Sequence, residues 1–412
     1  MMNKQERLLL SLYFLYFVLS FCIYSGTIPY QSYIKIILLI LILFWQKNYP
    51  LRMPVNTSMI FVWTILVVSV ITNVSSEKWI TNIAQLIQIT LLWILVLQYC
   101  QSWKRWYDII RILFISTLIG GPVIGVIQLI KGGYLYNSQL DMTFASIVVV
   151  NANQNNSNYS AITMLIPMVL GCVLCAQSRK KLFYGASVLF SLLAFVMTYS
   201  RGGIAAFALA VVSVFGIYYT KKSRKKIKKQ GLILMSFLFL LAIIMCIFFG
   251  QSIFKEIGIK ISENELLQTL LKFKSTSKLS GRMQQWNACI EAFMNGNFKQ
   301  KIMGYGNEYA EYLALYSGNL MTAHNIFFGQ LAENGIIGGI SIIWFYARVL
   351  KKSVQLSVND SESRYIAVLV LTVCFMYMLI SSFIFEFFCI FIIFDAFIAL
   401  KHQKKRENKS IE

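Results

Sequence analysis

The sequence predicts an all-α fold, a polytopic helical membrane protein with about 12 transmembrane helices. Of its 412 residues, 57% are hydrophobic and 13% charged, only 5 are proline, and long apolar runs alternate with short polar loops. A helix that crosses the ~30 Å apolar layer of a bilayer needs about 20 apolar residues, so twelve need about 240. This composition excludes a soluble enzyme, a disordered chain and a disulfide-stapled secreted domain. The alternating ~10-residue segments of a membrane barrel are also missing.

The predicted spans follow the apolar runs along the chain. They lie near residues 8–25, 33–46, 58–73, 79–99, 109–130, 159–177, 182–199, 204–220, 231–250, 325–350, 365–382 and 383–400. We expect the first to be a retained anchor rather than a cleaved signal peptide, because a second span follows it and no small-residue cleavage site is evident.

The basic residues predict the orientation of these spans. The net charge is +21, from 38 Lys and Arg against 17 Asp and Glu. Clusters fall in alternate loops, at Lys104–Arg105, Arg179–Lys181, Lys221–Lys229, Lys351–Lys352 and Lys401–Lys409. Since cytoplasmic loops carry the excess of Lys and Arg, both termini are expected in the cytoplasm. No nucleic-acid motif accompanies these clusters, so membrane lipid rather than nucleic acid is the expected partner.

Three regions follow from this topology. Residues 1–250 hold helices 1–9, residues 251–323 form a large outer loop between helices 9 and 10, and residues 324–412 hold helices 10–12 and a basic cytoplasmic tail. Loops of about 73 residues are usually functional, so we expect an extracytoplasmic catalytic loop. Within it, residues 265–273 have the apolar spacing of a surface helix, and a second helix is expected from about 282 to 293.

Arg201 is unusual for a short outer hairpin, where the positive-inside bias disfavours arginine. It lies in Ser200-Arg201-Gly202-Gly203, between the seventh and eighth spans. A guanidinium binds phosphate in a bidentate manner, and glycines allow a ligand to approach the backbone closely. The alternative is an arginine that reaches lipid headgroups without a catalytic role.

His324 and Arg282 are two further candidates. His324 is one of two histidines and lies where the large loop enters the tenth span; a mostly neutral imidazole there could accept a proton, or merely bond to the loop. Arg282 lies four residues before Trp286, on the same helical face, and could equally be a solvated surface arginine. No Walker A motif or metal-ligand cluster is present, so no cofactor and no metal are expected.

Together these motifs resemble the O-antigen polymerase/ligase superfamily. The resemblance rests on the Arg201 element, on Arg282 with Trp286, on the Gly304-Tyr305-Gly306 turn, and on His324-Asn325 followed by Glu333 and Gly335. It covers most of the chain from about residue 150. Asn153-Gln154-Asn155 resembles the Asn-Pro-Asn element of the family without its proline, whereas residues 1–130 are similar only in hydropathy.

The resemblance implies a GT-C-like membrane glycosyltransferase that uses a lipid-diphosphate-linked glycan donor without metal. In the polymerase branch, which we favour, undecaprenyl-diphosphate-linked oligosaccharides are joined at the outer face of the cytoplasmic membrane, with a chain-length regulator and a flippase as further partners. Arg201 and Arg282 would stabilise the leaving diphosphate and His324 would be the general base. Gly202, Gly203, Asn325, Trp286 and Glu333 would complete substrate binding. The alternatives are an O-antigen ligase and, in another class, a lipid-linked-glycan transporter.

Overall fold

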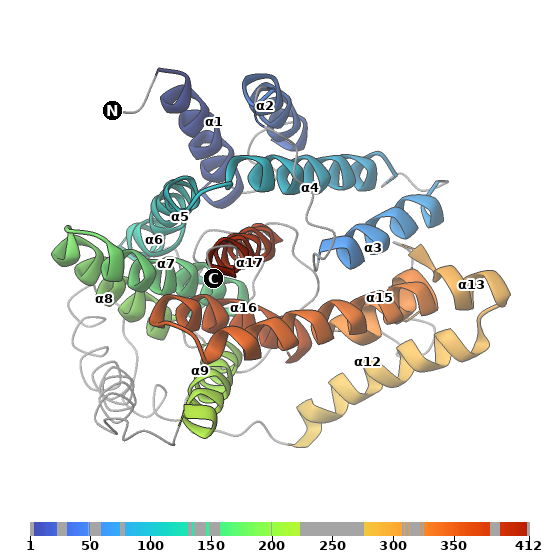
Figure 1. Cartoon of the computed structure of the whole chain (residues 1–412). Coiled ribbons are helices and arrows are strands. Elements are labelled where there is room, and N and C mark those ends of the chain that lie inside the picture. Colours follow the sequence, from blue (N-terminus) through green and yellow to red (C-terminus); the bar gives the residue numbers. More distant parts are fainter. Residues whose placement is uncertain are drawn as a thin grey trace.

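Helices make up almost all of the described chain (Figure 1). The computed structural model describes residues 4–22, 31–47, 49, 59–74, 79–130, 134–135, 146–147, 157–198, 200–222, 276–306, 309, 313, 323, 325–379 and 388–409. The helices are α1 (Lys4–Phe21), α2 (Gln31–Trp45), α3 (Met59–Thr72), α4 (Trp79–Tyr99), α5 (Trp103–Leu118), the π-helical turn η1 (Ile119–Val123), α6 (Ile124–Ile130), α7 (Ser157–Gln177), α8 (Lys181–Met197), α9 (Arg201–Lys222), α12 (Thr276–Asn295), α13 (Phe298–Met303), α15 (Ile326–Ser357), α16 (Ser361–Leu379) and α17 (Phe388–Lys409). Two strands of two residues each, β1 (Tyr134–Leu135) and β2 (Ser146–Ile147), pair antiparallel.

Helices occupy eleven of the twelve predicted spans. The remaining span, the ninth at 231–250, and the predicted surface helix at 265–273 lie outside the described residues. The second loop helix is confirmed as α12, which is longer than expected. Within the described residues, five helices are long and apolar enough to cross a membrane, and several shorter apolar helices accompany them. The chain is therefore a multi-pass helical membrane protein.

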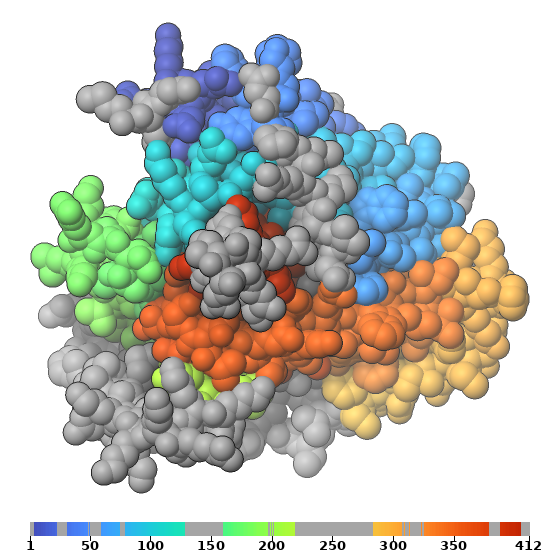
Figure 2. Space-filling view, in the orientation of Figure 1, coloured from blue at the N-terminus to red at the C-terminus, as the bar shows by residue number. Residues whose placement is uncertain are grey.

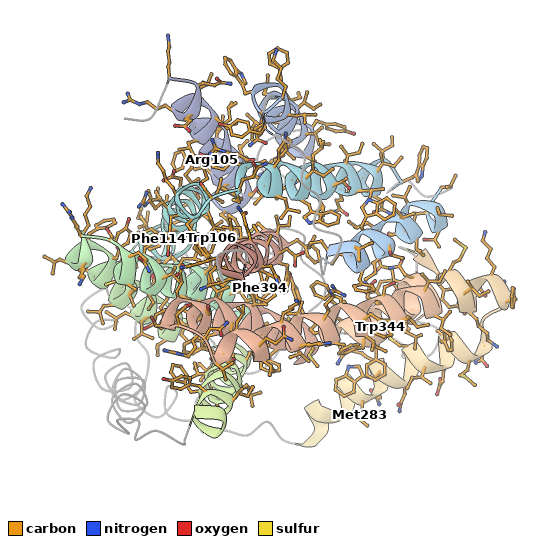
Figure 3. The ribbon with its side chains drawn as sticks, in the orientation of Figure 1. Arg105, Trp106, Phe114, Met283, Trp344 and Phe394 are labelled. Carbon is orange, nitrogen blue, oxygen red and sulfur yellow. The ribbon has the colours of Figure 1, made fainter. Side chains whose placement is uncertain are left out.

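The helices pack around one large apolar core. Figure 3 shows Trp106 and Phe114 of α5 close to Phe394 of α17 near the middle of the molecule, and all three side chains are fully buried. The Trp106 indole also donates to the Ile393 carbonyl on α17, at 3.3 Å. These contacts join helices that are almost 300 residues apart in sequence, so α5 and α17 belong to one bundle.

Polar contacts at one end of the bundle hold both ends of the described chain together. Arg105 pairs with Glu6 of α1 at 3.8 Å, and Lys401 of α17 pairs with Asp360 at 2.5 Å. Tyr107 of α5 donates to Glu362 of α16 at 2.6 Å. The start of α1 and the last part of α17 therefore lie at the same end.

Helix α15 reverses direction at Gly335, which has a φ of 62°. Phe327 and Tyr346 are 19 positions apart, yet their ring centroids are separated by only 5.2 Å. A straight helix would hold them about 28 Å apart. Gly338 also lies close to the Gln330 backbone, because a Cβ added to this glycine would be 2.7 Å from the Gln330 carbonyl oxygen. Residues 326–334 thus fold back along the helix that follows. The span predicted near 325–350 is present as a candidate membrane span, Ile326–Ser357, and the reversal at Gly335 divides it. Residues 336–357, about 33 Å of helix, are long enough to cross a bilayer.

The loop helices share a second, smaller core with this folded-back segment. Its members are Ala288, Cys289, Ala292, Leu313, Ala323 and Ala332, with Tyr305, Tyr309 and Phe328 packed against them. Figures 1 and 2 show α12 and α13 together beside one end of α15. Small side chains at these positions let α12 lie close to the segment that precedes Gly335.

Candidate functional site

Arg201 is the first residue of α9, and Ser200 caps that helix. The Gly203 amide donates to the Ser200 hydroxyl at 2.9 Å, as in a standard N-terminal cap. A Cβ on Gly203 would lie 2.5 Å from the Cβ of Ala161 on α7, so glycine here permits close helix packing. Gly202 is half-buried, and the Arg201 side chain lies outside the described part of the chain. The cap and the packing fix the first turn of α9 against α7.

The first turn of α9 lies level with the last turn of α16. The two helices pack along their lengths, and the Arg364 guanidinium near the start of α16 lies 4.2 Å from the Tyr218 ring near the end of α9. The helices are therefore antiparallel. Counting 14 residues along each helix from this contact, about 21 Å, places Met378 beside Ile204. Arg201 thus begins its helix next to the end of α16, at the opposite end of the bundle from the described chain ends.

His324 lies outside the described residues, but both of its sequence neighbours are held in place. The Asn325 side-chain amide donates to the Met378 carbonyl at 2.8 Å, at the end of α16. The Asn325 carboxamide oxygen accepts from the Phe327 amide at 2.9 Å and caps α15. On the other side, the Ala323 carbonyl accepts from the Trp286 indole at 3.0 Å. The peptide that carries His324 therefore runs between two anchored residues.

Arg282 lies on α12, one helical turn before Trp286, and its side chain is outside the described part of the structure. Trp286 is half-buried and stacks on Phe328, with ring centroids 5.4 Å apart and ring planes at 21°. Because Trp286 bonds to Ala323, this turn of α12 lies against the start of α15. The structure thus brings the backbone positions of Arg201 and Arg282 toward the same two anchored neighbours of His324.

The Gly304-Tyr305-Gly306 turn locks α13 against the reversal in α15. Gly304 and Gly306 have φ values of 79° and 67°, so the predicted tight turn is confirmed. The Tyr305 amide donates to the Ala332 carbonyl at 2.9 Å, and its hydroxyl donates to the Ala292 carbonyl of α12 at 2.6 Å. Side chains at 304 or 335 would collide across this junction. The turn is structural and joins α12, α13 and α15.

Glu333 is half-buried on the folded-back segment. Gln330 donates to its carboxylate at 3.4 Å, and the Glu333 backbone packs directly on Gly304. Within the described residues, no three or more His, Cys, Asp or Glu side chains lie close enough together to hold a metal ion. The part of the site that is described therefore offers carbonyl, amide and carboxylate groups near two arginine positions.

Sequence reasoning did not find the groups that hold the site together. The Met378 and Ala323 carbonyls are backbone atoms, which no residue pattern identifies. In the sequence, nothing distinguishes Phe328 and Tyr305 from other aromatic residues. Their roles follow from the stacking of Phe328 on Trp286 and from the hydrogen bond of Tyr305 to Ala292. The one available signal was the Gly-Tyr-Gly turn, which marked the junction but not its partner.

Comparison with known proteins supports the resemblance on part of the chain. No curated protein matches this sequence. The segment 186–343 includes Arg201, Arg282, Trp286, His324 and Glu333, and so spans the junction of α9, α12 and α15. This segment matches the family described as O-Antigen ligase, Wzy_C, and the match supports the resemblance to the O-antigen polymerase/ligase superfamily.

Proposed function

We propose that this chain is a polymerase of undecaprenyl-diphosphate-linked oligosaccharide repeat units. It acts at the outer face of the cytoplasmic membrane of a bacterium, with both termini in the cytoplasm and no metal or cofactor. The observation that carries the proposal is the meeting of three segments at one end of the bundle. Arg201 is at the start of α9, and Arg282 is one turn before Trp286 on α12. The residues on either side of His324 are bound to Trp286 and to the end of α16.

The proposed reaction transfers a glycan from a lipid diphosphate to a sugar hydroxyl. The hydroxyl oxygen of the incoming repeat unit attacks the anomeric carbon of the growing glycan, and the bond from that carbon to the phosphate oxygen breaks. The electron pair leaves with the diphosphate, whose charge Arg201 and Arg282 stabilise. The hydroxyl proton passes to the His324 imidazole. The donor is already activated, so the step needs no nucleotide.

The remaining predicted substrate-binding residues divide into two groups. The described contacts of Gly203, Asn325 and Trp286 lie within the protein, so we propose that these residues shape the site. Gly202 and Glu333 are half-buried. We propose that they contact the glycan or its diphosphate.

An O-antigen ligase is the second candidate, because the matching family carries that description. The donor and the three principal residues would be the same, and the acceptor would be a lipid A core sugar or another terminal acceptor. The two reactions differ only in acceptor, so the choice of acceptor in the assay decides between them.

The test uses the purified full-length chain with a synthetic lipid-diphosphate-linked repeat unit. A ladder of products that each grow by one repeat unit supports the polymerase. A single addition to a core oligosaccharide, without a ladder, supports the ligase. Movement of the lipid-linked unit across a vesicle membrane, without a new glycosidic bond, supports a transporter. Transfer should persist in EDTA; its loss and recovery with a divalent cation would contradict the metal-independent mechanism.

A further inference from the structure

Trp286 is joined to the segment around His324 by two separate contacts. Its indole N–H donates to the Ala323 carbonyl at 3.0 Å, directly before His324. Its ring stacks on Phe328, in the first turn of α15. An indole has a single hydrogen-bond donor. That donor is used for the peptide that leads into His324, so Trp286 does not offer it to a sugar in this arrangement.

The helix that carries Trp286 is itself firmly seated. The same helix buries Ala288, Cys289 and Ala292 in the small second core, which also contains Ala323 and Phe328. The Tyr305 hydroxyl donates to the Ala292 carbonyl, and the Tyr305 amide donates to the Ala332 carbonyl. The helix that carries the indole is therefore joined to the folded-back segment near its start, at Phe328, and near its end, at Ala332 through Tyr305.

We propose that Trp286 is a positioning residue that holds His324 in place through the Ala323 carbonyl. Asn325, which follows His324, is anchored by its bond to Met378. Ala323, which precedes His324, is anchored by its bond to Trp286, and we call these two anchors the clamp. The catalytic consequence rests on the proposed function, whereas the effect on the conformation of His324 does not. A misplaced base costs up to about a hundredfold in rate, and the loss of one of two anchors should cost about tenfold.

The first experiment removes only the hydrogen bond. Benzothienylalanine in place of Trp286 keeps the ring and its stacking on Phe328 but substitutes sulfur for the indole N–H. We expect kcat for transfer to fall about tenfold while KM for the lipid-linked donor changes less than about twofold. Trp286→Phe should behave alike, and Trp286→Ala should be worse. The control is benzothienylalanine at Trp344, an exposed residue on α15 shown in Figure 3, which should leave both constants unchanged.

A double-mutant cycle asks whether Trp286 acts through His324. If it does, benzothienylalanine at 286 should cause no further loss of the residual activity of His324→Ala. An independent tenfold loss in that background would show that Trp286 acts elsewhere, and would overturn the proposal. An unchanged kcat for the single variant would also overturn it.

A spectroscopic experiment tests the positioning without reference to catalysis. The chain has only two histidines, so His402→Gln leaves His324 as the single source of histidine signals. With ¹³C-labelled histidine, the protein with Trp286 should give one narrow resonance and one titration. Benzothienylalanine at 286 should broaden, split or shift that resonance, and the same change at Trp344 should not. An unaltered spectrum for the 286 variant would overturn the proposal. If the spectrum changes but His324→Ala transfers at the wild-type rate, the clamp holds and the base assignment fails.

Discussion

At the scale of single residues, the two arginines have the same proposed task but stand on different elements. Arg201 begins the apolar helix α9, which Ser200 caps, and Arg282 lies on α12, one turn from Trp286. A diphosphate carries enough charge for both. Replacing either arginine by alanine should lower transfer by about 10²–10³-fold, the usual cost of one donor that stabilises a leaving oxyanion. The measurement is polymer length and rate with purified protein.

Conservative variants separate charge from geometry at these two positions. Lysine keeps the charge but loses the bidentate fork, so Arg201→Lys and Arg282→Lys should recover only part of the activity. The matched control is Arg111→Ala, because Arg111 pairs with Asp108 on α5, away from the site. Wild-type polymer from Arg201→Ala would remove that residue from the mechanism.

His324 should separate catalysis from donor binding. His324→Ala should lose about 10²–10⁴-fold in transfer, the usual contribution of a positioned base, and still bind the lipid-linked donor through the arginines. Transfer by the wild type should fall as the pH is lowered and the imidazole gains its proton. Donor binding is measured separately on the same preparations. Loss of donor binding along with transfer would make His324 a phosphate ligand or a structural residue.

At the scale of elements, the reversal of α15 depends on Gly335. Its φ of 62° is costly for any residue with a Cβ, and that Cβ would lie 2.5 Å from the Ile302 backbone. Gly335→Ala should therefore lower the free energy of unfolding by about 1–3 kcal/mol. The variant should have a lower thermal midpoint in detergent and a lower rate of transfer. Gly216→Ala on α9 is the control, since its Cβ would meet nothing within 4 Å. Equal midpoints for the two variants would contradict the folded-back geometry.

The helices could be predicted from the sequence because hydropathy reports burial in lipid, which each span satisfies on its own. The reversal in α15 could not, because residues 325–350 are apolar whether the chain runs straight or folds back. Gly335 was noticed only as part of a motif. Its conformation depends on Ile302 and Gly304, which a hydropathy pattern does not connect to it.

The candidate site shows the same division between local and distant information. Local spacing placed Trp286 on the same face of a helix as Arg282, and α12 confirms that helix. The sequence does not reveal the hydrogen bond from Trp286 to Ala323, which lies 37 positions further along the chain. The bond from Asn325 to the Met378 carbonyl, 53 positions away, is likewise not evident from the sequence. Such pairings arise from tertiary packing and leave no periodic signal.

At the scale of the whole molecule, the end of the bundle opposite the site depends on a charge pair between α17 and the start of α16. Partial burial alone would raise the pKa of Asp360, but hydrogen bonds from Lys401 and Ser363 outweigh it and lower the pKa from 3.8 to about 2. A depressed carboxyl pKa stabilises the fold above its unfolded value, and the contribution disappears as the pH falls from about 4 to about 2.

This linkage gives a prediction for stability against pH. The wild type should lose thermal stability between about pH 4 and about pH 2, and Asp360→Asn should lose less over the same interval. Asparagine can still accept from the Ser363 amide, a bond of 2.8 Å in the wild type, so the helix cap survives and only the charge is removed. Thermal unfolding in detergent at several pH values measures the difference. If the thermal midpoints of the two proteins fall in parallel as the pH is lowered, the Asp360 carboxylate does not contribute to the pH dependence of stability.

The orientation of the bundle in the membrane decides whether the site can meet a lipid-linked glycan outside the cell. The basic run at 221–229 predicts that position 230 faces the cytoplasm and that position 277 faces outward. A cysteine introduced at 277 should react with an impermeant thiol reagent in whole cells, and one at 230 should react only after lysis. The native Cys289 should give little background, because it is buried and burial raises the pKa of its thiol to about 12. The wild-type protein, which lacks both new cysteines, is the control. Labelling in the reverse order would place Arg201, Arg282 and His324 in the cytoplasm, where the proposed donor is not displayed, and the polymerase assignment would fall with the topology.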